Sequence, residues 1–90
     1  MTTEPALEAS AEQAVTVRYW AGARAAAGVS QDVVPAGFVR DVTSAVAGLR
    51  PALVPVLAVA TLLVDGVRCG PHDRVPPGAV LEVLPPFAGG

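Results

Sequence analysis

The sequence has 90 residues, of which 52% are hydrophobic and 16% charged, and its formal net charge is −2 at pH 7. This length predicts one small domain with its own core. The negative charge argues against a nucleic-acid-binding protein, which needs clustered basic residues, and the single cysteine excludes an intrachain disulfide or a cysteine zinc site.

Residues 1–13 are acidic and carry few large apolar side chains, so we expect a flexible N-terminal extension. They lack the basic start and apolar run of a secretory signal. The longest apolar stretch, residues 51–64, contains two prolines and is too short to span a bilayer. We therefore expect a cytoplasmic protein that binds no membrane.

Several short runs predict strands. Residues 15–20 alternate and are rich in β-branched and aromatic side chains, which is typical of a half-buried strand, with Val15, Val17 and Tyr19 on its core face. Residues 29–34 predict a second strand. The remaining predicted strands are residues 58–64, 67–69 and 80–84, the first two joined by an Asp65-Gly66 hairpin turn.

Two stretches predict helical structure. Residues 21–28 are rich in alanine and end at Gly28, which suits a short helix with a glycine C-terminal cap. Between residues 38 and 50, valines and leucine recur on one helical face, and Pro51 ends the pattern. Residues 51–56 predict an irregular or 3₁₀ turn.

The resulting order of elements, β-β-α-β-β-β, predicts an α+β fold in which a small mixed sheet of four to five strands packs on one main helix. Its simplest arrangement is the ubiquitin-like β-grasp, with the first and last strands parallel and adjacent at the centre. We assign this domain to residues 14–84 and an extended, flexible tail to residues 85–90.

The tail, Pro85-Pro86-Phe87-Ala88-Gly89-Gly90, follows a strand directly. Prolines end sheet pairing and favour an extended chain. Gly89 and Gly90 lack a Cβ, so they can enter a channel too narrow for other residues. Extended, these six residues reach about 20 Å. We therefore expect Pro86, Phe87, Ala88 and Gly89 to insert into a partner and to deliver the α-carboxylate of Gly90.

The most specific motif is this ending, supported by the opening strand, the Gly28 turn, the helix from Val39 and the Val64-Asp65-Gly66 hairpin. On these residues, from about Val15 to Gly90, the chain resembles the MoaD/ThiS family of ubiquitin-like sulfur carriers, and most of all the small subunit of molybdopterin synthase. It carries Asp65-Gly66 where that family usually has Asn-Gly, and Gly78-Ala79 where Gly-Asp is usual.

The resemblance implies a carrier chemistry at Gly90. A ubiquitin-activating-like adenylyltransferase would use ATP to adenylate the carboxylate, and a persulfide from a sulfurtransferase would then displace AMP to leave a thiocarboxylate. The larger molybdopterin synthase subunit, or another sulfur-accepting enzyme, would receive the sulfur. The catalytic side chains would belong to these partners, so we predict no catalytic residue, no metal site and no cofactor in this chain.

Two residue types deserve a structural interpretation. Cys69 stands alone beside a strand and is expected to act as a small hydrophobic side chain. His72 stands alone in a predicted turn, and we expect neither a ligand nor a catalytic role for it.

A docking surface follows from the strand faces. Trp20, Leu63 and Leu84 are expected to form an exposed apolar patch at the root of the tail, next to a cross-strand ion pair of Arg18 and Glu82. In the alternative interpretation, Trp20 is covered by residues 21–28 and only closes the edge of the core.

The sequence leaves the pathway open. The alternatives are a sulfur carrier for thiamin, cysteine or specialised-metabolite biosynthesis, a protein modifier conjugated through Gly90 to lysines of other proteins, and a β-grasp binding module whose Gly-Gly ending is incidental.

Overall fold

The computed structural model describes residues 13–86, so the extension predicted for residues 1–13 lies almost entirely outside the described residues. In chain order the elements are β1 (Ala14–Tyr19), α2 (Ala21–Ala27), β2 (Gln31–Pro35), β3 (Gly37–Phe38), α3 (Val39–Leu49), a 3₁₀ turn (Pro51–Leu53), α4 (Val54–Leu57), β4 (Thr61–Val64), β5 (Val67–Arg68), β6 (Arg74–Val75) and β7 (Val80–Leu84).

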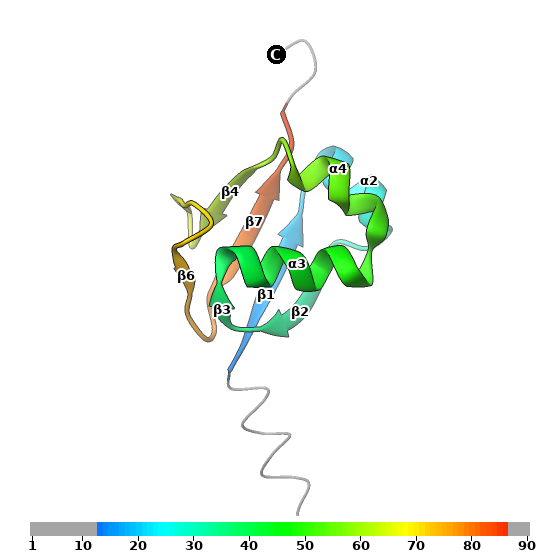
Figure 1. Cartoon of the computed structure of the whole chain (residues 1–90). Helices are drawn as coiled ribbons and strands as arrows, with labels where there is room; N and C mark the ends of the chain where they lie inside the picture. The colour runs from blue at the N-terminus through cyan, green and yellow to red at the C-terminus, as the bar shows by residue number, and fades with distance from the viewer. Residues whose placement is uncertain (1–12, 87–90) are drawn as a thin grey trace, which may run out of the picture.

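Five strands form one mixed sheet in the order β2-β1-β7-β4-β5. The central strands β1 and β7 are parallel, and the other neighbours are antiparallel. The helices α3 and α4 lie on one side of this sheet, with α3 running across its strands, and α2 lies at the end of the sheet where β1 ends (Figure 1). This topology confirms the predicted β-grasp and its parallel central pair.

The core lies between α3 and the inner face of the sheet. Alternation along β1 and β7 turns every second side chain inward, and the period of α3 turns one row of valines toward them. Full burial of an aliphatic side chain of this size contributes roughly 1.5–3 kcal/mol. The side chains with at most 1% exposure are Val15, Val17, Tyr19, Ala23, Val39, Val42, Val46, Leu53, Val75, Leu81 and Val83.

Two predicted turns have the expected backbone geometry. Gly28 caps α2 in the left-handed region at φ 78°, and its N–H donates to the Arg24 carbonyl. Asp65 and Gly66 have φ values of 48° and 83°, as the tight hairpin between β4 and β5 requires. Both turns therefore follow from residues that tolerate positive φ.

Other boundaries differ from the prediction. The strand expected from residue 58 begins only at Thr61, because the Ala58 and Val59 N–H groups continue the helical turn by donating to the Val54 and Val56 carbonyls. The second strand begins at Gln31. A two-stranded ribbon, β3 with β6, was not predicted at all.

None of the helices between residues 13 and 86 combines the length and apolar character needed to cross a membrane.

Candidate functional site

The root of the tail lies where the two central strands end. Because β1 and β7 are parallel, both strands finish at the same end of the sheet (Figure 1), so Trp20, which follows β1, leaves the sheet at the same end as Leu84, the last residue of β7. The Trp20 N–H donates to the Val83 carbonyl at 3.2 Å. Pro85 is half-buried beside α2, where a Cβ on Gly22 would lie 4.0 Å from its Cγ, whereas Pro86 is exposed.

The two prolines lie beyond the last residue of β7, as predicted for residues that end sheet pairing. Phe87, Ala88, Gly89 and Gly90 lie outside the described residues. The predicted insertion of the tail, including Pro86, and the predicted chemistry at Gly90 therefore stay predictions.

The sheet face opposite the helices holds the predicted docking residues. Leu63 on β4 is the register partner of Glu82 on β7, and Leu84 follows Glu82 by two residues on the same face. Leu63 and Leu84 are half-buried, and 43% of Trp20 is exposed. The structure thus brings Leu63 and Leu84 to neighbouring strands on one face, and Trp20 lies directly after β1, while docking on these residues stays a prediction.

Glu82 lies between these apolar residues and binds one of them. The Trp20 indole Nε1–H donates to Glu82 Oε2 at 3.1 Å, which holds the indole over β7. The predicted Arg18–Glu82 ion pair is wrong: the two residues are register partners, but between residues 13 and 86 the one ion pair joins Arg50 to Asp32. The Glu82 carboxylate is oriented toward Trp20 instead.

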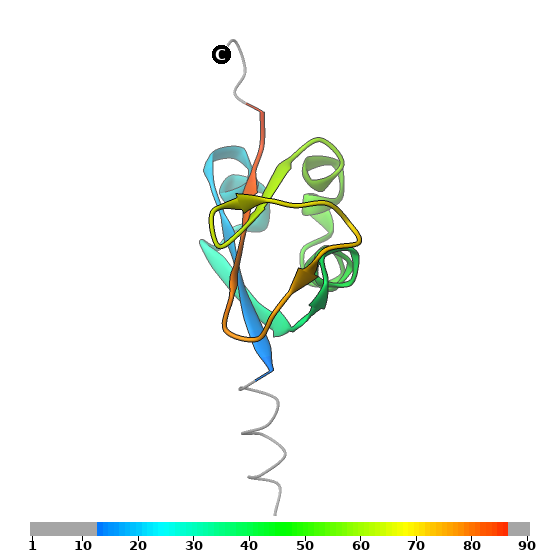
Figure 2. The same ribbon diagram turned by 90° about the vertical axis from the view of Figure 1, so that its left-hand side faces the viewer.

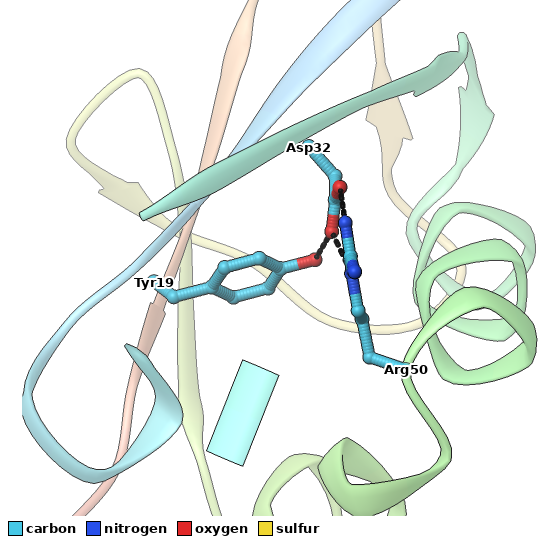
Figure 3. A network of polar contacts seen from close by, with 3 residues as sticks. All are labelled: Tyr19, Asp32 and Arg50. Atoms are coloured by element: carbon cyan, nitrogen blue, oxygen red, sulfur yellow. Dashed lines mark hydrogen bonds and ion pairs between the residues drawn. The ribbon is translucent and has the colours of Figure 1, made fainter. Parts of the chain in front are cut away.

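Tyr19, the residue before Trp20, belongs to a polar network with Asp32 and Arg50 that the sequence did not predict. Asp32 on β2 accepts a 2.7 Å hydrogen bond from the Tyr19 hydroxyl and two from Arg50, from Nη2 at 2.7 Å and from Nε at 3.2 Å (Figure 3). The network therefore joins β1, β2 and the residue after α3. Neither Asp32 nor Arg50 was assigned a role from the sequence.

The network shifts the ionisation of its members. The two hydrogen bonds from Arg50 lower the pKa of Asp32, and the Tyr19 bond adds to this effect against the cost of burial. Burial, followed by the bond to Asp32, raises the pKa of the Tyr19 hydroxyl. One signal for this network was available, because a tyrosine on the core face needs a polar partner for its hydroxyl.

The cysteine and histidine form no nucleophilic pair. The Cys69 thiol donates to the Leu62 carbonyl at 3.5 Å, and burial raises its pKa. His72 accepts at Nδ1 from Arg40 at 3.2 Å. Residues 13–86 contain no group of three or more histidine, cysteine, aspartate or glutamate side chains that could hold a metal ion.

No protein-family model matches the sequence, and no curated protein matches it. Solved structures do. SAMP1 from Haloferax volcanii superimposes with a TM-score of 0.78 at 23% identity, covering 86% of this chain and 99% of that one. The SAMP1 of Methanosarcina acetivorans, a small archaeal modifier protein, gives the same TM-score and identity over 86% of this chain and 96% of its own.

Two further structures carry the name of a molybdopterin converting factor. The putative subunit 1 from Pyrococcus furiosus gives a TM-score of 0.73 at 25% identity, over 82% of this chain and 98% of that one. A complex of subunits 1 and 2 from Helicobacter pylori gives a TM-score of 0.66 at 19% identity, over 86% of this chain and 99% of the matched chain. The chain therefore has the ubiquitin-like β-grasp fold of SAMP1 and of molybdopterin converting factor subunit 1, and its resemblance to MoaD-like carriers extends to the folded domain.

Proposed function

We propose that the chain is a ubiquitin-like sulfur carrier that acts through the α-carboxylate of Gly90, and that it serves as the small subunit of molybdopterin synthase in the cytoplasm. The observation that carries this proposal is the exit of the chain from the central strand β7. Pro85 and Pro86 follow β7 without a turn, beside the partly exposed Trp20, and the sequence continues into Gly89-Gly90.

The chemistry requires activation because a carboxylate is a poor acyl donor. In the proposed sequence, a Gly90 carboxylate oxygen attacks the α-phosphorus of ATP on a ubiquitin-activating-like enzyme, and pyrophosphate leaves. A persulfide supplied by a sulfurtransferase then attacks the acyl carbon, and AMP leaves. A second thiol then attacks the sulfur of the resulting acyl disulfide that is not bonded to the acyl carbon. The S–S bond breaks, a new disulfide forms between the two thiol sulfurs, and the other sulfur stays on Gly90 as the thiocarboxylate.

The domain contributes presentation to this chemistry. Its buried sheet and α3 fix the direction in which β7 ends, and Trp20, Leu63 and Leu84 offer apolar area on the face beside that exit. The Helicobacter pylori structure, in which subunit 1 is complexed with subunit 2, supports a larger subunit as the sulfur-accepting partner of this chain.

A second candidate function is conjugation of Gly90 to lysines of other proteins, and the fold similarity to the small archaeal modifier SAMP1 favours it. The chain itself contains no lysine, since all six of its basic side chains other than His72 are arginine. It therefore offers no lysine for chains built on itself. Carriers for thiamin, cysteine or specialised metabolites would use the same chemistry at Gly90.

The first experiment is intact-mass analysis of the purified full chain. After incubation with a cognate activating enzyme, ATP and a sulfur donor, we expect an oxygen-to-sulfur mass increase located on the C-terminal peptide. Deletion of Gly90 should abolish the increase without unfolding the domain. Gly48→Ala is the matched control, because a Cβ at this exposed helix position meets no atom within 4 Å and lies outside the tail.

The outcomes separate the candidates. No mass increase with any such enzyme would contradict the carrier. Branched peptides that carry Gly89-Gly90 on lysines of target proteins would favour the modifier, and co-purification with a larger molybdopterin synthase subunit would favour the proposed pathway.

A further inference from the structure

A cluster of basic side chains surrounds Phe38 at the end of the sheet remote from the tail. The Arg74 guanidinium lies 4.6 Å from the centre of the Phe38 ring and that of Arg40 lies 5.1 Å from it, both within cation–π distance. Arg40 also donates to His72 Nδ1 at 3.2 Å. We call Phe38, Arg40, His72 and Arg74 the basic cluster.

Within residues 13–86 the cluster has no carboxylate partner, because the one ion pair there is Arg50–Asp32. Two acids flank it in sequence, and neither forms an ion pair with an arginine of the cluster. Asp73 accepts the Gly70 N–H at 2.7 Å, and Asp41 lies in the first turn of α3. Two guanidinium groups thus share one aromatic ring without a counter-ion among residues 13–86, so an added carboxylate there gains attraction from both.

The charges of the chain are divided unevenly. Residues 13–86 hold all six arginines and five carboxylates, which leaves one excess positive charge, whereas residues 1–12 hold Glu4, Glu8 and Glu12 and no basic side chain. Residues 1–12 therefore carry carboxylates that could pair with the arginines of the basic cluster.

The chain enters the domain close to the cluster. Gln13 and Arg74 line one surface hollow of about 300 Å³, whose other walls are Ala36, Gly37, Val75, Pro76 and Pro77. The Ala36 N–H donates to the Gln13 carbonyl at 2.7 Å, and the Gly78 N–H donates to the Ala14 carbonyl at 2.9 Å. The turn after β6 thus lies against the start of β1, below the β3–β6 ribbon (Figure 2).

We propose that residues 1–12 dock through their glutamates on the basic cluster of the same chain. Glu12 is bonded to Gln13, which lines the same hollow as Arg74, and twelve residues can reach roughly 40 Å when extended, which is ample for Glu8 and Glu4 to approach Arg40. The docked segment neutralises the basic cluster and leaves the opposite end, with Trp20 and Pro86, open to partners. This proposal does not depend on the chemistry at Gly90.

Paramagnetic broadening in the full chain tests the proposal. A nitroxide on Ala6→Cys in a Cys69→Ser background should cause loss of amide signal at Arg40, His72 and Arg74. The loss should be greater at 0.1 M than at 1 M NaCl, since the screening length falls from about 10 Å to about 3 Å over this range. Arg40→Gln with Arg74→Gln should restore the signals.

Two controls make the result specific. Arg18→Gln with Arg24→Gln removes the same charge from exposed positions outside the cluster and should leave the broadening intact. The second control uses no nitroxide. A triple variant should show shifted amide signals around the basic cluster relative to the unmodified chain; its substitutions are Glu4→Gln, Glu8→Gln and Glu12→Gln. The proposal is overturned by broadening that is absent, that survives the loss of Arg40 and Arg74, or that centres on Trp20.

A competition arm distinguishes this occupant from an acidic partner. Added hexaglutamate should bind the triple glutamine variant more tightly than the unmodified chain, because the segment no longer competes. Equal binding to both proteins would contradict docking of the segment and would assign the basic cluster to another acidic chain.

Discussion

Replacing Tyr19 by phenylalanine tests how much the network of Tyr19, Asp32 and Arg50 contributes to the free energy of unfolding of the domain. The substitution removes only the hydroxyl, which donates a 2.7 Å hydrogen bond to Asp32 Oδ2 (Figure 3). The ring keeps its place in the core, where Tyr19 is 1% exposed. No methylene is removed, so no cavity accompanies the loss of the bond.

The expected cost follows from the charge of the acceptor. A hydrogen bond to an ionised group contributes roughly 1.5–3 kcal/mol to stability. Because Arg50 keeps both of its bonds to the carboxylate, we expect the lower end, about 1.5 kcal/mol for Tyr19→Phe. For a domain of this size that corresponds to a fall in Tm of about 6–12 °C.

The same network also makes the stability of the domain depend on pH. Asp32 has a lowered pKa in the folded state, so its contribution is complete above the ordinary value of 3.8 and is lost as the pH falls through the folded value. Tyr19 has a raised pKa, so its contribution is complete below the ordinary value of 10.0 and is lost as the pH rises past it. The phenylalanine variant should lack the alkaline loss.

Urea unfolding at pH 7, and at acid and alkaline pH, measures both effects. Tyr19 is the sole tyrosine of the chain, so absorbance titration reports its ionisation directly and should give a midpoint above 10 in the folded protein. A Tyr19→Phe variant within about 0.5 kcal/mol of the parent at pH 7, the range of neutral surface substitutions, would refute this reasoning.

Three further predictions concern separate features. Trp20→Ala should weaken binding of a larger synthase subunit by at least about tenfold if Trp20 is an anchor, while Val67→Ala, at an exposed strand position, should leave binding unchanged in the same titration. Gly66→Ala should lower the free energy of unfolding by about 1–2 kcal/mol because φ is +83°, whereas Gly48→Ala in α3 should raise it by roughly 0.5–1 kcal/mol. Cys69 should react with iodoacetamide at pH 8 more slowly than free cysteine, because burial raises its pKa, and denaturation should remove the difference.

The parts of the fold that were predicted correctly are those written in local patterns. The alternation of residues 15–20, the helical spacing after Phe38 and the Asp65-Gly66 pair each specify one element from neighbouring residues alone. The β3–β6 ribbon was missed because each of its strands has two residues, too few for any period to be visible. The strand predicted for residues 58–64 began too early, because residues 58–60, two alanines and a valine, also suit the turn that ends α4.

The side-chain partners were harder to predict than the elements. Strand register correctly placed Arg18 opposite Glu82, but register alone does not decide which donor a carboxylate chooses, and Glu82 binds the Trp20 indole. Asp32 and Arg50 are 18 residues apart and meet only once β2 and α3 are packed. Both outcomes depend on tertiary geometry that no sequence spacing encodes.

The same geometry separates the stability of the domain from the presentation of its tail. The direction of the tail depends on the register of β7, which is fixed on one side by β1 and on the other by β4. A slip of one residue would turn Val83 outward and Leu84 inward, so the buried row resists it. The hydrogen bonds of the Tyr19 network join β1 to β2 and to the residue after α3, and none of them goes to β7. Tyr19→Phe should therefore lower Tm while leaving sulfur loading of Gly90 unchanged at temperatures where the domain stays folded, and a parallel loss of both would show that the network also sets the exit of the tail.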